Sequence, residues 1–183
     1  YVAACIAPSN DVLMLAIEGP GTRGGHDLYV SRRTGAHTWS TPVNLGDVIN
    51  TGKEETTPFL AADGRTLFFS SSGHPGYGKL DVFMSRRLDD SWTSWSVPVN
   101  LGPDINNDAG QAFYAVAADG SVAYFSQPGP DGSSDIWSIE LPEALVPLPT
   151  VAITGTVYDN ATRRPVAARG AYERLSDGKP LGN

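Results

Sequence analysis

The 183-residue sequence is poor in cysteine, in basic side chains and in long apolar runs. Cys5 is the only cysteine, which excludes an internal disulfide and a cysteine-based zinc site. The sequence has no run of about 18 apolar residues, so we expect no spanning helix and no direct membrane insertion by this segment. Thirteen Lys and Arg against twenty Asp and Glu give a formal charge of -7, a sign that argues against nucleic acid or anionic lipid as a partner.

Glycine and proline, in contrast, are abundant, with 20 and 14 residues, and hydrophobic residues make up 40% of the chain. A chain of this composition is not disordered, but long helices are not expected, because about one residue in five forms turns or breaks helices. Tyr1 opens directly on strand-like sequence without an initiator Met, which predicts that the chain is cut from a longer one.

Three segments recur along the chain at nearly constant distance, and equal steps imply equal structural units. Residues 27–33 (DLYVSRR) return as 81–87 (DVFMSRR) and weakly as 135–140 (DIWSIE), at steps of 54 residues. Residues 39–46 (WSTPVNLG) return as 95–102 (WSVPVNLG), and Ile49-Asn50 returns as Ile105-Asn106, each displaced by 56. Residues 61–70 (AADGRTLFFS) return as 117–126 (AADGSVAYFS), with a degraded copy at 7–16.

Each repeat predicts four short strands separated by turn signals. In the best copy these strands cover about residues 58–62, 65–70, 80–86 and 96–100, which are rich in aromatic and branched residues. Asp63-Gly64, repeated as Asp119-Gly120, favours a tight two-residue hairpin in which Gly supplies a positive φ. Pro42 and Pro98 place the fourth strand at the outer edge of its sheet, since Pro donates no ladder hydrogen bond.

The sequence therefore predicts an all-β protein, a partial β-propeller of four-stranded antiparallel blades with about two and a half to three blades present. The blades are expected at residues 1–46, 57–102 and 113–141, and the third lacks an outer strand, which either the start of a fuller chain or residues 146–151 could supply. A ring needs about four to eight blades. Either further blades precede Tyr1, which is the favoured interpretation, or the chain is part of an assembly. Trp39 and Trp95 are expected to pack between blades, with a ligand-stacking platform as the alternative.

The pattern changes after residue 141. Residues 142–150 are rich in Pro and predict a semi-extended linker. Residues 151–160 then alternate like a half-buried strand, residues 161–166 predict a turn, and residues 169–175 predict a second strand. Together, residues 151–183 predict the opening strands of a truncated β-sandwich.

These motifs resemble a known family of bacterial envelope proteins. Residues 63–71, 81–87 and 95–102 resemble the WD-repeat-like propellers related to that of the Tol-Pal system, over residues 1 to about 141. Residues 151–159 and 162–166 are similar to the first strands of a carboxypeptidase-regulatory-like sandwich. In this order the two resemble the outer-membrane protein A-like family of Bacteroidetes, some members of which serve type IX secretion and gliding. The resemblance implies a periplasmic, outer-membrane-associated scaffold that binds envelope proteins, and that reaches peptidoglycan through a domain outside this chain.

Signatures of catalysis are missing from the sequence. It contains no Gly-x-Ser-x-Gly elbow, no phosphate-binding Gly-x-x-x-x-Gly-Lys-Ser/Thr loop and no His-Glu-x-x-His motif. The three histidines, His26, His37 and His74, fall at unrelated repeat positions. We therefore expect no catalytic residue and no cofactor.

Two sets of acidic residues are candidates for binding. Asp104, Asn106 and Asp108 have the alternate spacing of a Ca²⁺ loop, but the turn glycine comes one place late and Ala115 stands where a bidentate Glu belongs, so a solvated loop is the favoured interpretation. The repeated residues Asp27, Asp81 and Asp135 could form a ring of carboxylates for a ligand. Their repetition favours instead a structural role, in which each carboxylate accepts backbone N–H bonds.

The leading functional hypothesis is a non-enzymatic scaffold whose propeller binds protein partners. One alternative is a glycan-active propeller enzyme of the glycosidase or sialidase kind, which would use two carboxylates near the channel. Another is a purely structural assembly subunit, which would self-associate.

Overall fold

We analysed a computed structural model that describes residues 3–129, 131–150, 155–168, 172–173 and 180–182. The chain divides into two compact units, residues 1–150 and 151–183. Residues 142–150, for which a linker is expected, lie within the first unit. Among the described residues, no helix has the length and apolar character needed to cross a membrane.

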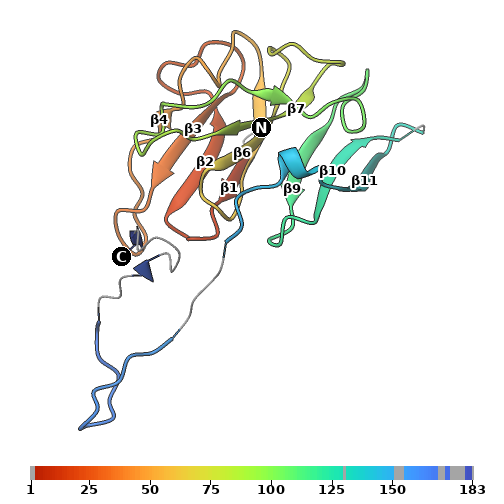
Figure 1. Cartoon of the computed structure of the whole chain (residues 1–183). Helices are drawn as coiled ribbons and strands as arrows, with labels where there is room; N and C mark the ends of the chain where they lie inside the picture. Colours follow the sequence, from red (N-terminus) through yellow and green to blue (C-terminus); the bar gives the residue numbers. More distant parts are fainter. Residues whose placement is uncertain (1–2, 130, 151–154, 169–171, 174–179, 183) are drawn as a thin grey trace. The chain divides into compact units, whose positions relative to one another are not determined.

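The first unit is all-β, and its described residues form three antiparallel sheets (Figure 1). In each sheet, strands that follow one another in the chain are hydrogen-bonded neighbours. Sheet 1 contains β1 (Ala3–Ile6), β2 (Val12–Ile17), β3 (Asp27–Arg32) and β4 (Val43–Asn44); sheet 2 contains β5 (Glu55–Leu60), β6 (Thr66–Ser71), β7 (Asp81–Arg86) and β8 (Val99–Asn100); sheet 3 contains β9 (Ala112–Val116), β10 (Val122–Pro128) and β11 (Ser134–Glu140). The predicted all-β class with antiparallel four-stranded sheets is confirmed.

Sheet 2 lies between the other two sheets and shares an apolar core with each of them (Figure 1). Phe69 and Phe83 face the core shared with sheet 1, while Phe68 and Val82, on the opposite face, meet Tyr114 of sheet 3. Both faces of sheet 2 are therefore dry, which explains why β6 is apolar at consecutive positions rather than alternating.

The turn between the first two strands of each sheet differs from the expected two-residue hairpin. The Gly64 N–H donates to the Ala61 carbonyl at 3.0 Å, and Ala61 closes the hairpin by donating to Thr66, so four residues lie in the loop. Gly64 has the expected positive φ of 63°. Asn10 and Gly120 occupy the same place in sheets 1 and 3 and also have positive φ, so the turn is the same in all three sheets even where Asn replaces Gly.

A buried asparagine fixes the short fourth strand in sheets 1 and 2. Asn50 accepts the Leu28 N–H at 2.8 Å, and its amide group donates to the Leu28 carbonyl and to Asn44. Asn106 repeats these bonds in sheet 2, where its partners are Val82 and Asn100. β4 and β8 are only two residues long, so few backbone hydrogen bonds hold them in their sheets. The asparagine side chains supply the further hydrogen bonds that keep these strands in place.

Sheet 3 has three strands, and residues 146–150 do not add the fourth. They pack instead against the turns of sheets 2 and 3: Leu148 donates its N–H to Asp63 at 3.0 Å, and Arg86 reaches the Val146 carbonyl. The 3-10 helix η1 (Glu143–Leu145) just before them buries Leu145 in the core between these sheets. Of the two sources considered for an outer strand, the described part of 146–151 is excluded, because its prolines leave few N–H groups for a ladder.

The second unit is described only in part. β12 (Tyr172–Glu173) pairs with β13 (Pro180–Gly182), and Tyr158 forms an isolated antiparallel bridge with Pro165. Asp159 accepts the N–H groups of Ala161 and Thr162 and so forms the expected turn between these segments. Residues 151–154 and most of the second expected strand, 169–175, lie outside the described residues.

Candidate functional site

The first strands of the three sheets, β1, β5 and β9, lie next to one another and are each at the edge of their sheet. Two of them are bulged at the same repeat position. Thr57 in β5 and Phe113 in β9 both have positive φ, 44° and 55°, and the pairing register shifts around each of them. Such a backbone is unfavourable for a β-branched or aromatic residue, and conformations of this kind concentrate at functional sites.

The bulges open a groove of about 420 Å³ along the three first strands. The strands contribute three consecutive residues each, and these are small or apolar apart from one threonine, one cysteine and one tyrosine. The lining residues are Ala3, Ala4, Cys5, Thr57, Pro58, Phe59, Phe113, Tyr114 and Ala115.

Phe113 and Tyr114 give the groove its aromatic wall. Phe113 is more than half exposed, whereas Tyr114 is buried and stacks near Phe125 and Phe68. Burial raises the pKa of the Tyr114 hydroxyl to about 12, so it stays protonated as a donor, and it has no hydrogen-bond partner among the described residues. Burial likewise raises the pKa of the Cys5 thiol, which keeps it protonated and unreactive at neutral pH.

The repeated aspartates lie away from this groove, at the loops before the third strands. Asp27 accepts the N–H of Arg23 at 3.3 Å, and Asp81 accepts those of Tyr77 and Gly78 at 2.8 and 3.1 Å. Both carboxylates are buried and shape their loops, whereas Asp135 is exposed. The three therefore do not present one ring of equivalent, accessible carboxylates.

Asp81 also shows how sheets 1 and 2 differ. In sheet 1, the Asn44 amide donates to Asp27 at 2.8 Å. The corresponding atoms of sheet 2, Asp81 Oδ1 and Asn100 Nδ2, are buried without a partner among the described residues. The hydrogen bond between the Asn and Asp side chains of sheet 1 therefore has no equivalent in sheet 2.

The two repeated tryptophans have unequal surroundings. Trp95 is buried in the core between sheets 1 and 2, where its Nε1–H donates to the Trp92 carbonyl at 2.9 Å. Trp39 is half-buried, and the Arg33 guanidinium lies over its ring at 5.2 Å. In sheet 2 the corresponding Arg87 lies over Trp92 instead, at 4.3 Å. Trp95 therefore packs between sheets, and Trp39 carries a cation on its face.

The central residue of the candidate Ca²⁺ loop, Asn106, is already hydrogen-bonded within the protein. Asn106 is buried and its side-chain oxygen already accepts the Val82 N–H at 2.7 Å, while Asp104 and Asp108 are exposed. No group of three His, Cys, Asp or Glu side chains placed to hold a metal occurs among the described residues.

The three histidines have different surroundings. His26 Nδ1 lies 2.7 Å from Glu54 Oε1, between the loops of sheets 1 and 2. His74 packs edge-on against Phe69, and its Nε2 donates to the Ile49 carbonyl at 2.9 Å. His37 is exposed. His26 and His74 thus join segments of sheets 1 and 2.

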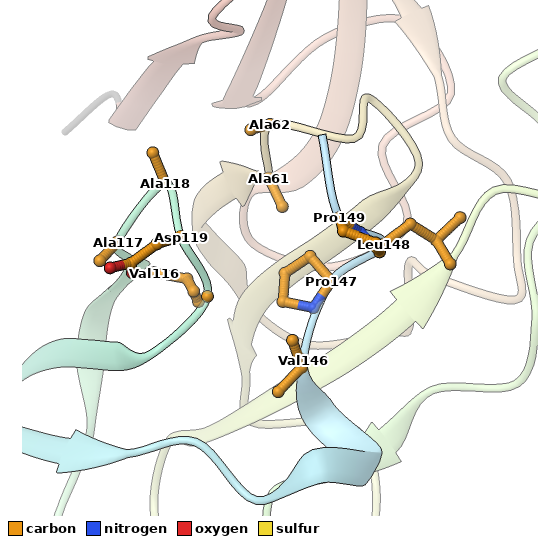
Figure 2. A pocket seen from close by; sticks show the side chains of 11 residues that line it. Ala61, Ala62, Val116, Ala117, Ala118, Asp119, Val146, Pro147, Leu148 and Pro149 are labelled. Atoms are coloured by element: carbon orange, nitrogen blue, oxygen red, sulfur yellow. The ribbon is translucent and has the colours of Figure 1, made fainter. Parts of the chain in front are cut away.

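A second hollow, of about 190 Å³, lies where residues 146–149 cross the turns of sheets 2 and 3 (Figure 2). Figure 2 shows Ala117 to Asp119 on one side of this crevice, and Ala61, Ala62 and the Pro-rich residues 147–149 on the other. A Cβ on Gly120 would lie 3.0 Å from Val146, so the turn and the segment are in close contact. The Pro-rich segment thus forms one wall of this hollow.

Asp63 anchors the Pro-rich segment. Burial alone would raise the pKa of Asp63, but the hydrogen bonds from Thr66, Arg65 and Leu148 outweigh it and hold the pKa below its ordinary value. Asp119 bonds only Ser121, whose N–H and hydroxyl lower the Asp119 pKa. Of the two repeated aspartates, Asp63 therefore connects the turn to another segment.

We predict that Asp63→Ala lowers the free energy of unfolding by about 1 kcal/mol, because the Leu148 N–H and the turn lose their acceptor. A depressed folded pKa gives stability that is present above the ordinary aspartate pKa and is lost as the pH falls through the folded value. The variant should therefore lose less stability on acidification than the parent. Urea unfolding at neutral and acid pH measures both effects, with Asp104→Ala, which replaces an exposed aspartate of another loop, as the control. Equal acid sensitivity of the parent and of Asp63→Ala would contradict the role.

In comparisons with known proteins, no family model, no curated protein and no solved structure matches the chain.

Proposed function

We propose that the three sheets are consecutive blades of a β-propeller, and that the groove along β1, β5 and β9 binds an extended segment of a protein partner. The observation that carries this proposal is the pair of bulges at Thr57 and Phe113, which open the groove at the same place in two repeats and expose an aromatic side chain. The function is that of a binding scaffold without catalytic activity.

The groove suits a polypeptide ligand for two reasons. Its strands are sheet edges, which present backbone N–H and C=O groups to a bound chain. Its exposed Phe113 and the small residues beside it provide an apolar surface for a ligand side chain. Among the described residues that line the groove, none carries a carboxylate, which favours binding over the glycosidase chemistry of two paired acids.

The cellular setting of the proposal follows from the resemblance of residues 63–71, 81–87 and 95–102 to envelope propellers. We place the chain in the periplasm, in association with the outer membrane, and its partners among envelope proteins. The net charge of -7 fits a protein partner better than a polyanion.

A displayed library of random peptides selected against the whole chain tests the groove. We expect selected peptides to carry aliphatic or aromatic anchors, and their affinity, measured by fluorescence anisotropy, to fall at least about tenfold in Phe113→Ser. Leu88→Ser is the matched control, since Leu88 has a similar exposed fraction but lies outside the groove. Peptides that bind both variants as well as the parent would overturn the groove as the binding site.

A panel of glycosides supplies the converse test. Turnover of any member by the chain would overturn the non-catalytic proposal, and absence of turnover together with peptide binding would support it.

A further inference from the structure

Both faces of sheet 2 are covered by neighbouring sheets, and they show which repeat positions a sheet uses to contact its neighbours. The same positions recur on the outer faces of sheets 1 and 3. On the face toward sheet 3, Phe68 and Val82 are both 0% exposed. The same repeat positions in sheet 3 are Tyr124 and Ile136, and the strand registers agree, since Ser70 pairs with Val82 as Ser126 pairs with Ile136. Tyr124 is 50% exposed and Ile136 is 82% exposed. Sheet 3 thus has the apolar face by which each sheet meets the next one, and the described residues of the first unit do not cover it.

Sheet 1 presents the complementary face. In sheet 2, the positions that meet the preceding sheet are Leu60, Leu67 and Phe69, all buried. Their counterparts in sheet 1 are Ile6, Leu13 and Leu15; Ile6 pairs with Leu13 as Leu60 pairs with Leu67. Ile6 is 47% exposed, and both leucines are partly exposed. Sheet 1 therefore carries the face by which a sheet meets the one before it.

We propose that these two faces bind each other between molecules, so that sheet 3 of one copy of this chain seats on sheet 1 of a second copy. The new contact continues the two interfaces that already join sheets 1, 2 and 3, and it uses the same repeat positions. Such a head-to-tail contact is heterologous and closes only if the rotation between subunits completes a ring. Two copies supply six sheets, within the range of about four to eight that closes a propeller.

The ring closure rests on the proposed propeller, whereas the pairing of the two faces rests only on the stacking of the three sheets. Peptide binding in the groove is a separate readout. A parent chain that binds peptides but does not self-associate would count against this inference alone.

Light scattering of the whole chain during size exclusion tests the contact. We expect a concentration-dependent species of about twice the 19.4 kDa chain mass, and self-association about a hundredfold weaker in Ile136→Glu and in Ile6→Glu, because each places a charge in a dry interface. Val97→Glu is the control, since Val97 is 79% exposed and belongs to neither face. Circular dichroism checks that the variants fold.

Mixing the two variants distinguishes head-to-tail pairing from pairing of like faces. Ile136→Glu keeps an intact sheet 1 face and Ile6→Glu keeps an intact sheet 3 face, so the mixture should recover a dimer through one good interface. A parent chain that stays monomeric at every soluble concentration would overturn the proposal. Dimers of Ile6→Glu as stable as those of the parent would also overturn it. They would show that two sheet 3 faces bind each other, since that contact does not involve Ile6.

Discussion

Replacing Asn106 by Ala is expected to lower the free energy of unfolding by about 3 to 5 kcal/mol. The Asn106 side chain is fully buried, accepts the Val82 N–H at 2.7 Å, and donates to the Val82 carbonyl at 2.9 Å and to Asn100 at 2.8 Å. The substitution leaves the Val82 N–H without a partner in a buried environment, which costs about 1 to 3 kcal/mol, and the lost bonds to the Val82 carbonyl and to Asn100 add to this cost. The Val82 carbonyl keeps one donor, the Leu101 N–H at 3.2 Å. Urea unfolding followed by tryptophan fluorescence measures the loss.

The control for this variant is Asp104→Ala, in the same loop. Asp104 is exposed, so its replacement should change stability by no more than about 0.5 kcal/mol. Asn50→Ala should reproduce the large loss in sheet 1, since Asn50 makes the corresponding bonds to Leu28. A loss below about 1 kcal/mol in both asparagine variants would show that water replaces the amide and that the outer strands are held by other contacts.

Gly78→Ala is expected to cost about 3 kcal/mol or more, although it adds only one methyl group. A Cβ on Gly78 would lie 2.0 Å from the Asn107 carbonyl oxygen and 2.5 Å from that of Ala109. Both atoms belong to the backbone of the segment that leads into sheet 3, so they cannot turn aside as a flexible side chain would. The substitution must push this segment away from the loop of sheet 2.

The same segment is tied to sheet 2 by backbone hydrogen bonds, from Lys79 to Ala109 at 3.0 Å and from Gln111 to Leu80 at 2.8 Å. Gly78→Ala should therefore weaken the contact between sheets 2 and 3 as well as the loop. Gly52→Ala is the matched control, because a Cβ on Gly52 would meet nothing within 4 Å. Thermal unfolding of the two variants tests the idea, and equal melting temperatures would contradict it.

The sequence repeats were sufficient to predict the class of the fold, since strands at constant spacing with Gly and Pro between them leave few alternatives to stacked antiparallel sheets. Repeats do not reveal what a recurring side chain bonds to. Asn50 and Asn106 recur at a step of 56 residues, but their buried role depends on the backbone of a strand 22 and 24 residues earlier. The turn at Asp63-Gly64 was predicted too short, because a four-residue loop and a two-residue loop use the same glycine.

The candidate groove could not be predicted from the sequence, because its residues carry no motif. Thr57 and Phe113 occupy one repeat position with unrelated side chains, and their likeness lies in the backbone φ alone. Pro58, which follows Thr57, and the tyrosine that follows Phe113 gave no sign of a bulge. The repeated aspartates, by contrast, were visible in the sequence, but the structure places Asp27 and Asp81 in loop hydrogen bonds away from the groove.

Each gap between two neighbouring sheets is filled by a residue that follows the third strand of the later sheet. Trp92, which follows β7, fills the gap between sheets 1 and 2, and Leu145, which follows β11, fills the gap between sheets 2 and 3. Each of these residues lies five or six positions beyond the third strand of the later sheet. A chain that stopped at that strand would therefore leave the last gap between its sheets unfilled, so the segment after the strand is needed to complete the packing.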